Sequence, residues 1–244
     1  MPDYGRLTQE RLPHALPLAS PLYPPPPWPL PDARILKLTF EVDKDVALNW
    51  LPPSLSRSSP AYAIITVAHY PQSPVGAFSL AVQHIGCRAR IFIRAFALQA
   101  ITDNEAALAA LREVWGFPAK LGRARLTATA GGASARVSRG GRPLAELRLR
   151  RLQPIDPASV RFDPVLNVRI HPAIEEGKRH SALEMVQVDP TYVLKEAARG
   201  RGELRYPSAN KGDPWHLLQP LNMISATYTV ADTELPFARF VMPY

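Results

Sequence analysis

The sequence has little cysteine and no long apolar run, and both absences narrow the classes of protein to consider. Its 244 residues include a single cysteine, Cys87, so no disulfide can form within the chain. No apolar stretch approaches the roughly 20 residues that a membrane-spanning helix needs, and residues 1–20 lack the basic start and apolar core of a signal peptide. The expected setting is a reducing cytoplasm, without a membrane.

The usual cofactor and metal motifs are also missing. The chain contains no GxGxxG, no phosphate-binding loop, no HExxH, no CxxC and no GxSxG. Its six histidines are dispersed, without the spacing of metal ligands. We interpret His69 and His84 as hydrogen-bonded structural residues and Cys87 as a small buried filler. No metal and no cofactor are therefore predicted.

Acidic residues are outnumbered, with 21 Asp and Glu against 29 Lys and Arg, and the net charge is +8. Such a chain can attract nucleic acid or other anions. The arginines are densest in residues 136–151, but no helix-turn-helix, zinc-finger or RNA-binding signature accompanies them. We interpret them as the solvated face of a strand, and nucleic acid is not the expected partner.

Alternating and β-branched residues predict many strands and few helices. A short helix is expected after Asp43, ending before Pro52, and a longer one over residues 103–115, capped by Asp103 or Asn104. The predicted strands cover residues 34–42, 61–70, 75–84, 90–100, three segments of 123–152 separated by Gly131-Gly132 and Gly140-Gly141, 183–188, 203–206, 223–230 and 236–242.

These elements predict a mainly β (α+β) protein with two or three short helices, folded as one domain over residues 1–244. So many strands are expected to close into a barrel or a sandwich, because open sheet edges are a liability. Residues 1–30 are rich in proline and read as an extended arm. Tyr23 and Trp28 are expected to anchor this arm on the body of the protein.

The run REVWGFPAKLG, residues 112–122, resembles the signature of the acetoacetate decarboxylase family, in which a helix ends in Arg-Glu and a Pro-Lys-Lys-Leu-Gly turn follows. Weaker likenesses lie at residues 20–24, 42–43, 51–52, 73–78 and 235–244, so the resemblance covers nearly the whole chain from about residue 15. It implies a closed, cone-like β-barrel that assembles into homo-oligomers.

The resemblance also implies a mechanism. In typical members a neutral lysine amine condenses with a ketone, and the iminium accepts the electrons released as carbon dioxide leaves. Matched residue by residue, the nucleophilic lysine is Ala119 here and the second lysine is Lys120. The two acidic pocket positions fall on Ile65 and Leu80, and the arginine at the barrel mouth falls near Ala33, beside Arg34.

Lys120 and Arg34 are thus the candidate catalytic cations. Neighbouring side chains of an extended segment point to opposite faces, so Lys120 reaches a cavity faced by Ala119 only if the backbone rotates there. The other candidate substrate-binding residues are Ile65, Phe78, Leu80, Arg112, Glu113, Trp115, Phe117 and Ala119. For Arg112 and Glu113 a structural role at the helix end, and for Trp115 and Phe117 core packing, are the alternatives.

Two functions follow from this resemblance. The first is an enzyme that acts on an apolar keto or carboxylated carbonyl compound by decarboxylation, C–C bond cleavage, dehydration with cyclisation, or isomerisation. Ordinary Schiff-base decarboxylation conflicts with Ala119 at the lysine position. The alternative is a non-catalytic protein that binds a small hydrophobic ligand, since apolar pocket residues suit binding without chemistry.

Overall fold

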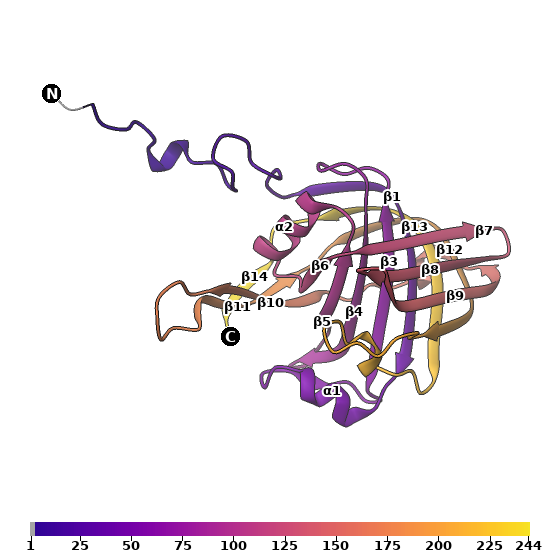
Figure 1. Cartoon of the computed structure of the whole chain (residues 1–244). Coiled ribbons are helices and arrows are strands. Elements are labelled where there is room, and N and C mark those ends of the chain that lie inside the picture. Colours follow the sequence, from indigo (N-terminus) through magenta and orange to yellow (C-terminus); the bar gives the residue numbers. More distant parts are fainter. Residues whose placement is uncertain (1–2) are drawn as a thin grey trace.

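The computed structural model describes residues 3–244, so residues 1–2 of the predicted arm lie outside the described part. Fourteen strands make up one sheet (Figure 1). They are β1 (Trp28–Glu41), β2 (Ser56–Arg57), β3 (Tyr62–Tyr70), β4 (Phe78–Ala89), β5 (Phe92–Thr102), β6 (Ala119–Leu121), β7 (Arg123–Thr129), β8 (Gly132–Arg139), β9 (Arg142–Pro154), β10 (Val165–Pro172), β11 (His180–Val188), β12 (Thr191–Arg205), β13 (Met223–Leu235) and β14 (Phe240–Pro243).

Two α-helices accompany the sheet, as the sequence predicts. In α1 (Lys44–Trp50) the Asp43 carboxylate accepts from the first backbone amides, and in α2 (Glu105–Glu113) the Asn104 side chain accepts from the Ala107 amide. Three short 3-10 helices complete the list, η1 (Gln9–Arg11), η2 (Pro157–Ser159) and η3 (Trp215–Leu217). Within residues 3–244, neither α-helix has the length and apolar character to cross a membrane.

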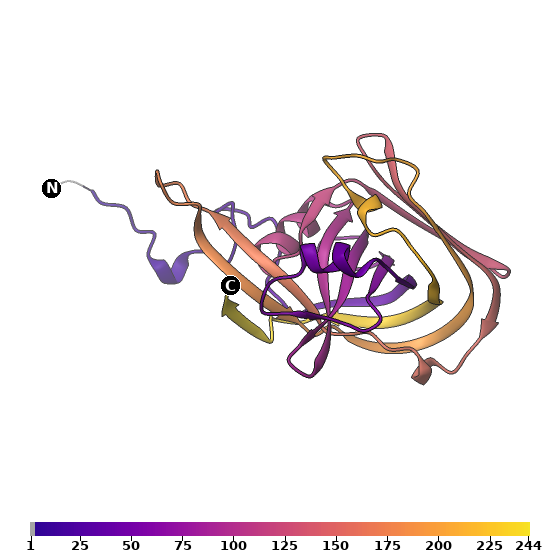
Figure 2. The same cartoon turned by 90° about the horizontal axis from the view of Figure 1, so that it is seen from below.

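The sheet is open, so the expected closed barrel is wrong. Its strand order is β14-β11-β10-β5-β4-β3-β1-β13-β12-β9-β8-β7, with β2 beside β4 and β6 beside β5, and no pairing within the described residues joins β7 to β14. Instead the sheet curls so far that β7 lies across β3, β4 and β5 (Figure 2). Side-chain packing across the curl, rather than a continuous hydrogen-bonded ring, buries the interior.

The central strands bury both of their faces, and the two largest of the hydrophobic cores result. On β3, Ile65 and Val67 belong to the core enclosed by the curl, together with Trp215. Leu80 and Val82 of β4 belong to a second core on the outer face, which α2 covers. Strands buried on both faces read as nearly continuous apolar runs, which is why 61–70 looks uniformly hydrophobic.

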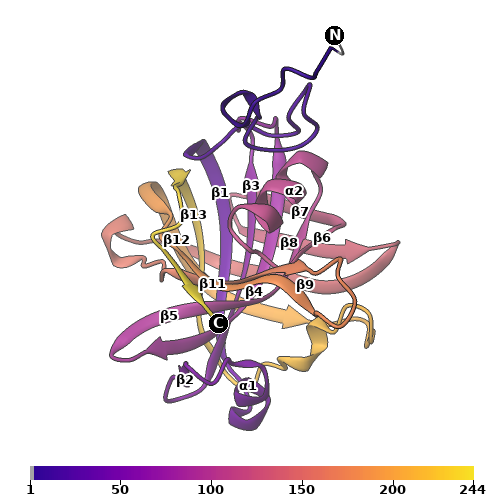
Figure 3. The same ribbon diagram turned by 90° about the vertical axis from the view of Figure 1, so that its left-hand side faces the viewer.

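The N-terminal arm is anchored by its later residues, from Ala15 in the second core to Trp28. The Tyr23 hydroxyl donates to the Glu113 carboxylate at 2.6 Å, and Trp28 packs edge-on against Trp115 with ring centroids 5.1 Å apart. The preceding residues are mostly exposed and extend away from the body (Figures 1 and 3). The arm is thus tied to the end of α2, next to the second core.

Candidate active site

A cavity lies on the outer face of β3 and β4, beside α2, with about 80 Å³ of space open to the centres of water molecules. It is bounded by side chains from β1, β3 and β4 on the sheet, from α2 and the segment that follows it, and from the segment that precedes β10. The lining residues are Leu30, Lys37, Ile64, Thr66, Ala68, Tyr70, Phe78, Leu80, Val82, His84, Ala95, Leu111, Phe117, Phe162, Asp163, Val165, Pro190, Tyr192, Thr233 and Leu235.

Most of this wall is apolar, and its charged groups are few. Phe78, Leu80 and Phe117 are buried members of the second core. Lys37 and Asp163 are the lining residues with a formal charge at neutral pH. An apolar pocket with a few polar groups is the usual form of a small-molecule site, so this cavity is the candidate active site.

Lys37 comes from the middle of β1. It pairs with Thr66 of β3 and Thr227 of β13, and its side chain is half-buried. Its Nζ donates to the Arg161 carbonyl oxygen at 2.5 Å and lies 4.9 Å from the centre of the Phe162 ring. Burial lowers the pKa of Lys37, and the negative charge of Asp163 opposes this shift.

His84 lies further along β4 on the same cavity wall. Both ring nitrogens are buried, and neither has a hydrogen-bond partner among the described residues. Burial lowers the pKa of His84 to about 3, with a further contribution from the positive charge of Lys37. The imidazole is therefore neutral at physiological pH, and its predicted role as a hydrogen-bonded structural residue is wrong.

An aromatic pair closes one side of the cavity. Phe162 stacks on Tyr192 of β12, with ring centroids 4.0 Å apart and planes 13° from parallel. Burial raises the pKa of Tyr192 and of Tyr70, another residue of this wall. Both phenols stay protonated, so they can serve as hydrogen-bond donors but not as bases.

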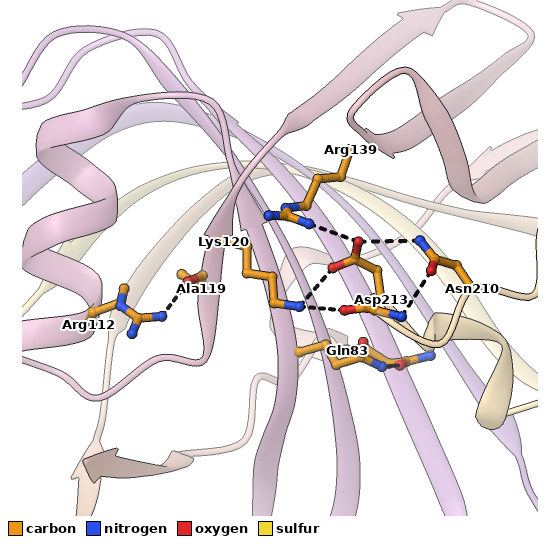
Figure 4. Close-up of polar contacts among 9 residues, drawn as sticks. Gln83, Arg112, Ala119, Lys120, Arg139, Asn210 and Asp213 are labelled. Atoms are coloured by element: carbon orange, nitrogen blue, oxygen red, sulfur yellow. Dashed lines mark hydrogen bonds and ion pairs between the residues drawn. The ribbon is translucent and has the colours of Figure 1, made fainter. Parts of the chain in front are cut away.

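Ala119 and Lys120 lie on opposite faces of β6, as alternation in an extended segment requires. Ala119 is fully buried in the second core, which also contains Leu80, and does not line the cavity. Lys120 points the other way, towards Asp213 (Figure 4). The backbone rotation that would bring Lys120 to the cavity is not present.

The Lys120 amine is held by its own set of partners. Its Nζ donates to the Gly212 carbonyl at 2.6 Å and to Asp213 Oδ1 at 2.9 Å, while Arg139 donates to Asp213 Oδ2 at 3.1 Å (Figure 4). Burial alone would raise the pKa of Asp213, but the hydrogen bonds from Lys120 and Arg139 bring it below its usual value. Lys120 and Asp213 do not line the cavity beside α2. They line a second cavity, together with Gln99, Pro118 and Trp215.

Two other predicted positions also need correction. Ile65 belongs to the core inside the curl, and its neighbour Ile64 lines the cavity, because alternate residues of β3 face opposite sides. Arg34 is exposed and does not line the cavity, since Lys37 faces the cavity and Arg34, three residues earlier on the same strand, faces away. The charged group that β1 brings to the site is Lys37.

The residues after α2 divide between cavity and core. Phe117 lines the cavity, whereas Trp115 is fully buried and donates through Nε1 to the Pro236 carbonyl at 2.7 Å. Arg112 donates to the Ala119 carbonyl at 2.9 Å (Figure 4). Glu113 accepts from Tyr23, so it fastens the arm. Arg112, Glu113 and Trp115 thus shape the turn rather than contact the cavity.

Comparison with protein families identifies the family to which this chain belongs. The family model described as acetoacetate decarboxylase (ADC) matches residues 15–244. The chain belongs to the acetoacetate decarboxylase family. Decarboxylase DEC1 of Cochliobolus heterostrophus is 25% identical to it in an alignment of 237 positions that covers 92% of each chain. Acetoacetate decarboxylase of Chromobacterium violaceum is 30% identical over 112 residues, 46% of each chain.

Solved structures place the fold in the same family. The crystal structure of acetoacetate decarboxylase from Legionella pneumophila matches with a TM-score of 0.87 at 21% identity, over 99% of both chains. The enduracididine biosynthesis enzyme MppR, solved in complex with pyruvate, matches with a TM-score of 0.75 at 19% identity, over 93% of this chain and 96% of its own. At these identities the likeness shows the acetoacetate decarboxylase fold.

Residue matching to the acetoacetate decarboxylase signature missed the polar side of the cavity. Lys37, Asp163 and Tyr192 are not in that signature. The alternation of residues 34–42 did separate Lys37 from Leu36 and Leu38. Nothing in that pattern tells which face meets a cavity, because both faces of β1 are covered.

Proposed function

We propose that the protein is an enzyme acting on a small apolar ketone or keto acid bound in this cavity. The observation that carries the proposal is an apolar cavity, on the scaffold of a decarboxylase family, with a half-buried lysine in its wall. The reaction class is decarboxylation or another C–C bond cleavage, a dehydration with cyclisation, or an isomerisation.

The lining suggests how such a substrate lies. Its apolar part packs against Phe78, Leu80 and Phe117. Its carbonyl or carboxylate group lies near Lys37, the one cation of the lining. Transfer of a carboxylate from water to such a wall replaces its hydration shell and favours loss of carbon dioxide.

A non-catalytic binding protein is the second candidate. Leu80, at one position where the family signature leads one to expect an acidic group, is an apolar residue of the cavity wall, and Ile65, at the other such position, lies in the core inside the curl. An apolar wall of this kind can hold a hydrophobic ligand without reacting with it. Tight binding of ketones and keto acids with no chemical change in any of them would favour this function. A homo-oligomeric state and a cytoplasmic location stay predictions.

The test combines binding with turnover. We expect 3-oxooctanoate to raise the melting temperature and to release carbon dioxide, because a ligand at 100 times its Kd stabilises the folded state by about 2.7 kcal/mol. Thr66→Phe fills the cavity from β3 and should abolish both effects. Thr127→Phe is the control, since Thr127 is an exposed threonine of β7 and does not line the cavity. Equal behaviour of the two variants would contradict the proposal.

A further inference from the structure

Lys37 differs from every other lysine of the chain. The other five, Lys44, Lys120, Lys178, Lys195 and Lys211, are exposed, and Lys37 alone is half-buried. Three of those five form salt bridges with carboxylates. Among the described residues no carboxylate lies within salt-bridge distance of Lys37. Its amine is partly desolvated and makes no ion pair within residues 3–244, and the nearest opposing influence is the charge of Asp163, another lining residue, which limits the lowering of its pKa.

We propose that Lys37 is the amine nucleophile of the cavity and condenses with the carbonyl carbon of the bound substrate. This inference rests on the proposed function, because it needs a carbonyl compound in the cavity. It assigns the covalent step to β1, whereas the residue signature points to β6. The cavity of this chain therefore contains an amine, that of Lys37, although Ala119 replaces the family lysine.

The surroundings of Lys37 suit this role. A lysine amine attacks a carbonyl only when it is neutral, and burial in apolar surroundings lowers the proton affinity that keeps it charged. The Arg161 carbonyl accepts one hydrogen of the amine, which orients Nζ without neutralising a charge. The neighbouring His84 is also neutral, so it does not compete for a proton.

The proposed step balances as follows. The lone pair of Nζ forms a C–N bond while the carbonyl π electrons move to oxygen, and the resulting hydroxyl leaves as water after it takes a proton. The product is an iminium ion joined to Lys37. If the substrate carries a carboxylate β to this carbon, the C–C bond breaks, the electron pair forms an enamine, and carbon dioxide departs. Protonation of the enamine carbon and hydrolysis by water release the ketone and the free amine.

The experiment is reduction by sodium borohydride in the presence of 3-oxooctanoate, with the modified residue located by peptide mass. Wild type and Lys44→Met should carry a secondary-amine adduct at Lys37, and Lys120→Met should do the same because Lys120 lies on the other face. Lys37→Met should lose both the adduct and turnover. Lys37→Arg keeps a positive charge and donors for the Arg161 carbonyl but cannot form an imine, so it should lose turnover while it still binds.

The outcomes separate the two proposals. Turnover by a folded Lys37→Arg protein, or an adduct found at Lys120, would overturn the role of Lys37 while the proposed function stands. Absence of both binding and turnover in wild type would overturn the proposed function itself, and the role of Lys37 with it. Benzoylacetone supplies an independent readout, because condensation of a β-diketone with an amine gives a conjugated product that absorbs in the near ultraviolet. That absorbance should appear in wild type and not in Lys37→Arg.

Discussion

Replacement of His84 by leucine should stabilise the protein, and more so in acid. In the native fold two ring nitrogens are buried without a partner. A buried polar group left unsatisfied costs about 1–3 kcal/mol, and leucine fills a similar volume with no polar atom. We therefore expect His84→Leu to raise the free energy of unfolding at pH 7 by about 1–3 kcal/mol.

The pH dependence supplies a second, independent magnitude. The pKa of His84 is about 3 in the folded state, well below its ordinary value of 6.5. Below pH 6.5 the unfolded chain therefore binds a proton that the folded chain does not, so wild-type stability falls as the pH falls towards 3. Each pH unit is worth about 1.4 kcal/mol. Between pH 6.5 and pH 5 the advantage of His84→Leu should grow by about 2 kcal/mol.

Urea unfolding at pH 7 and pH 5, followed by tryptophan fluorescence, measures both effects. His180→Leu is the control, because His180 is an exposed histidine at the start of β11. Its stability should differ little from wild type at either pH. The same difference between His84→Leu and wild type at both pH values would refute the account of a neutral, desolvated imidazole. A less stable His84→Leu at pH 7 would refute the claim that its nitrogens lack partners.

Two further changes probe the scaffold. Asp213→Asn removes the carboxylate between Lys120 and Arg139. We expect the free energy of unfolding, measured in urea, to fall by about 1–3 kcal/mol and turnover to stay unchanged. Reduced turnover in the folded variant would contradict the separation of this cluster from the active site. Gly86→Ala places a Cβ 2.2 Å from carbon atoms of the Tyr62 ring, so the melting temperature should fall, with a cost of about 1–3 kcal/mol. Gly131→Ala, where a Cβ meets nothing within 4 Å, is the matched control, and an equal effect of both glycine changes would contradict the steric reason.

Local sequence signals predicted the elements well where the periodicity was clear. The predicted helix at 103–115 corresponds to α2, with Asn104 as its cap. The glycine pairs at 131–132 and 140–141 separate three strands, as expected. β10 was not predicted, because VLNVRIHP interrupts its apolar residues with Asn167 and Arg169. Asn167 is buried and donates to the Trp115 carbonyl, a long-range contact that no local pattern reveals.

Local sequence patterns do not reveal long-range strand pairing, and this explains the errors in the candidate site. Matching to the family signature gave Ile65, but pairing in the folded sheet sets Leu80 opposite Ala68 and His84 opposite Ile64. A shift of one residue moves a side chain to the other face of a strand. Closure of the sheet also depends on whether its two end strands meet, and alternation within each strand carries no information about that.

Residue 119, the position of the family lysine, offers a last test. It asks whether an amine at residue 119 and the amine of Lys37 can serve the same cavity. Ala119 is fully buried in the core that contains Leu80 and Phe117, and both of these line the cavity. A lysine at 119 would thus be desolvated behind the same wall that Lys37 reaches from β1. In a Lys37→Arg background, Ala119→Lys should restore a borohydride adduct, now at residue 119, at a cost in stability of about 1–3 kcal/mol for the added volume.

Peptide mass after reduction with 3-oxooctanoate reads out this double variant, and Lys37→Arg alone is its control. An adduct at residue 119 would mean that two strands can deliver an amine to one apolar cavity, so the loss of a lysine on β6 does not by itself end amine chemistry in a family member. A folded double variant without an adduct would mean that side chains around Leu80 separate residue 119 from the cavity. In that case Lys37 could not be regarded as an equivalent amine in the same cavity, and β1 would define a site of its own.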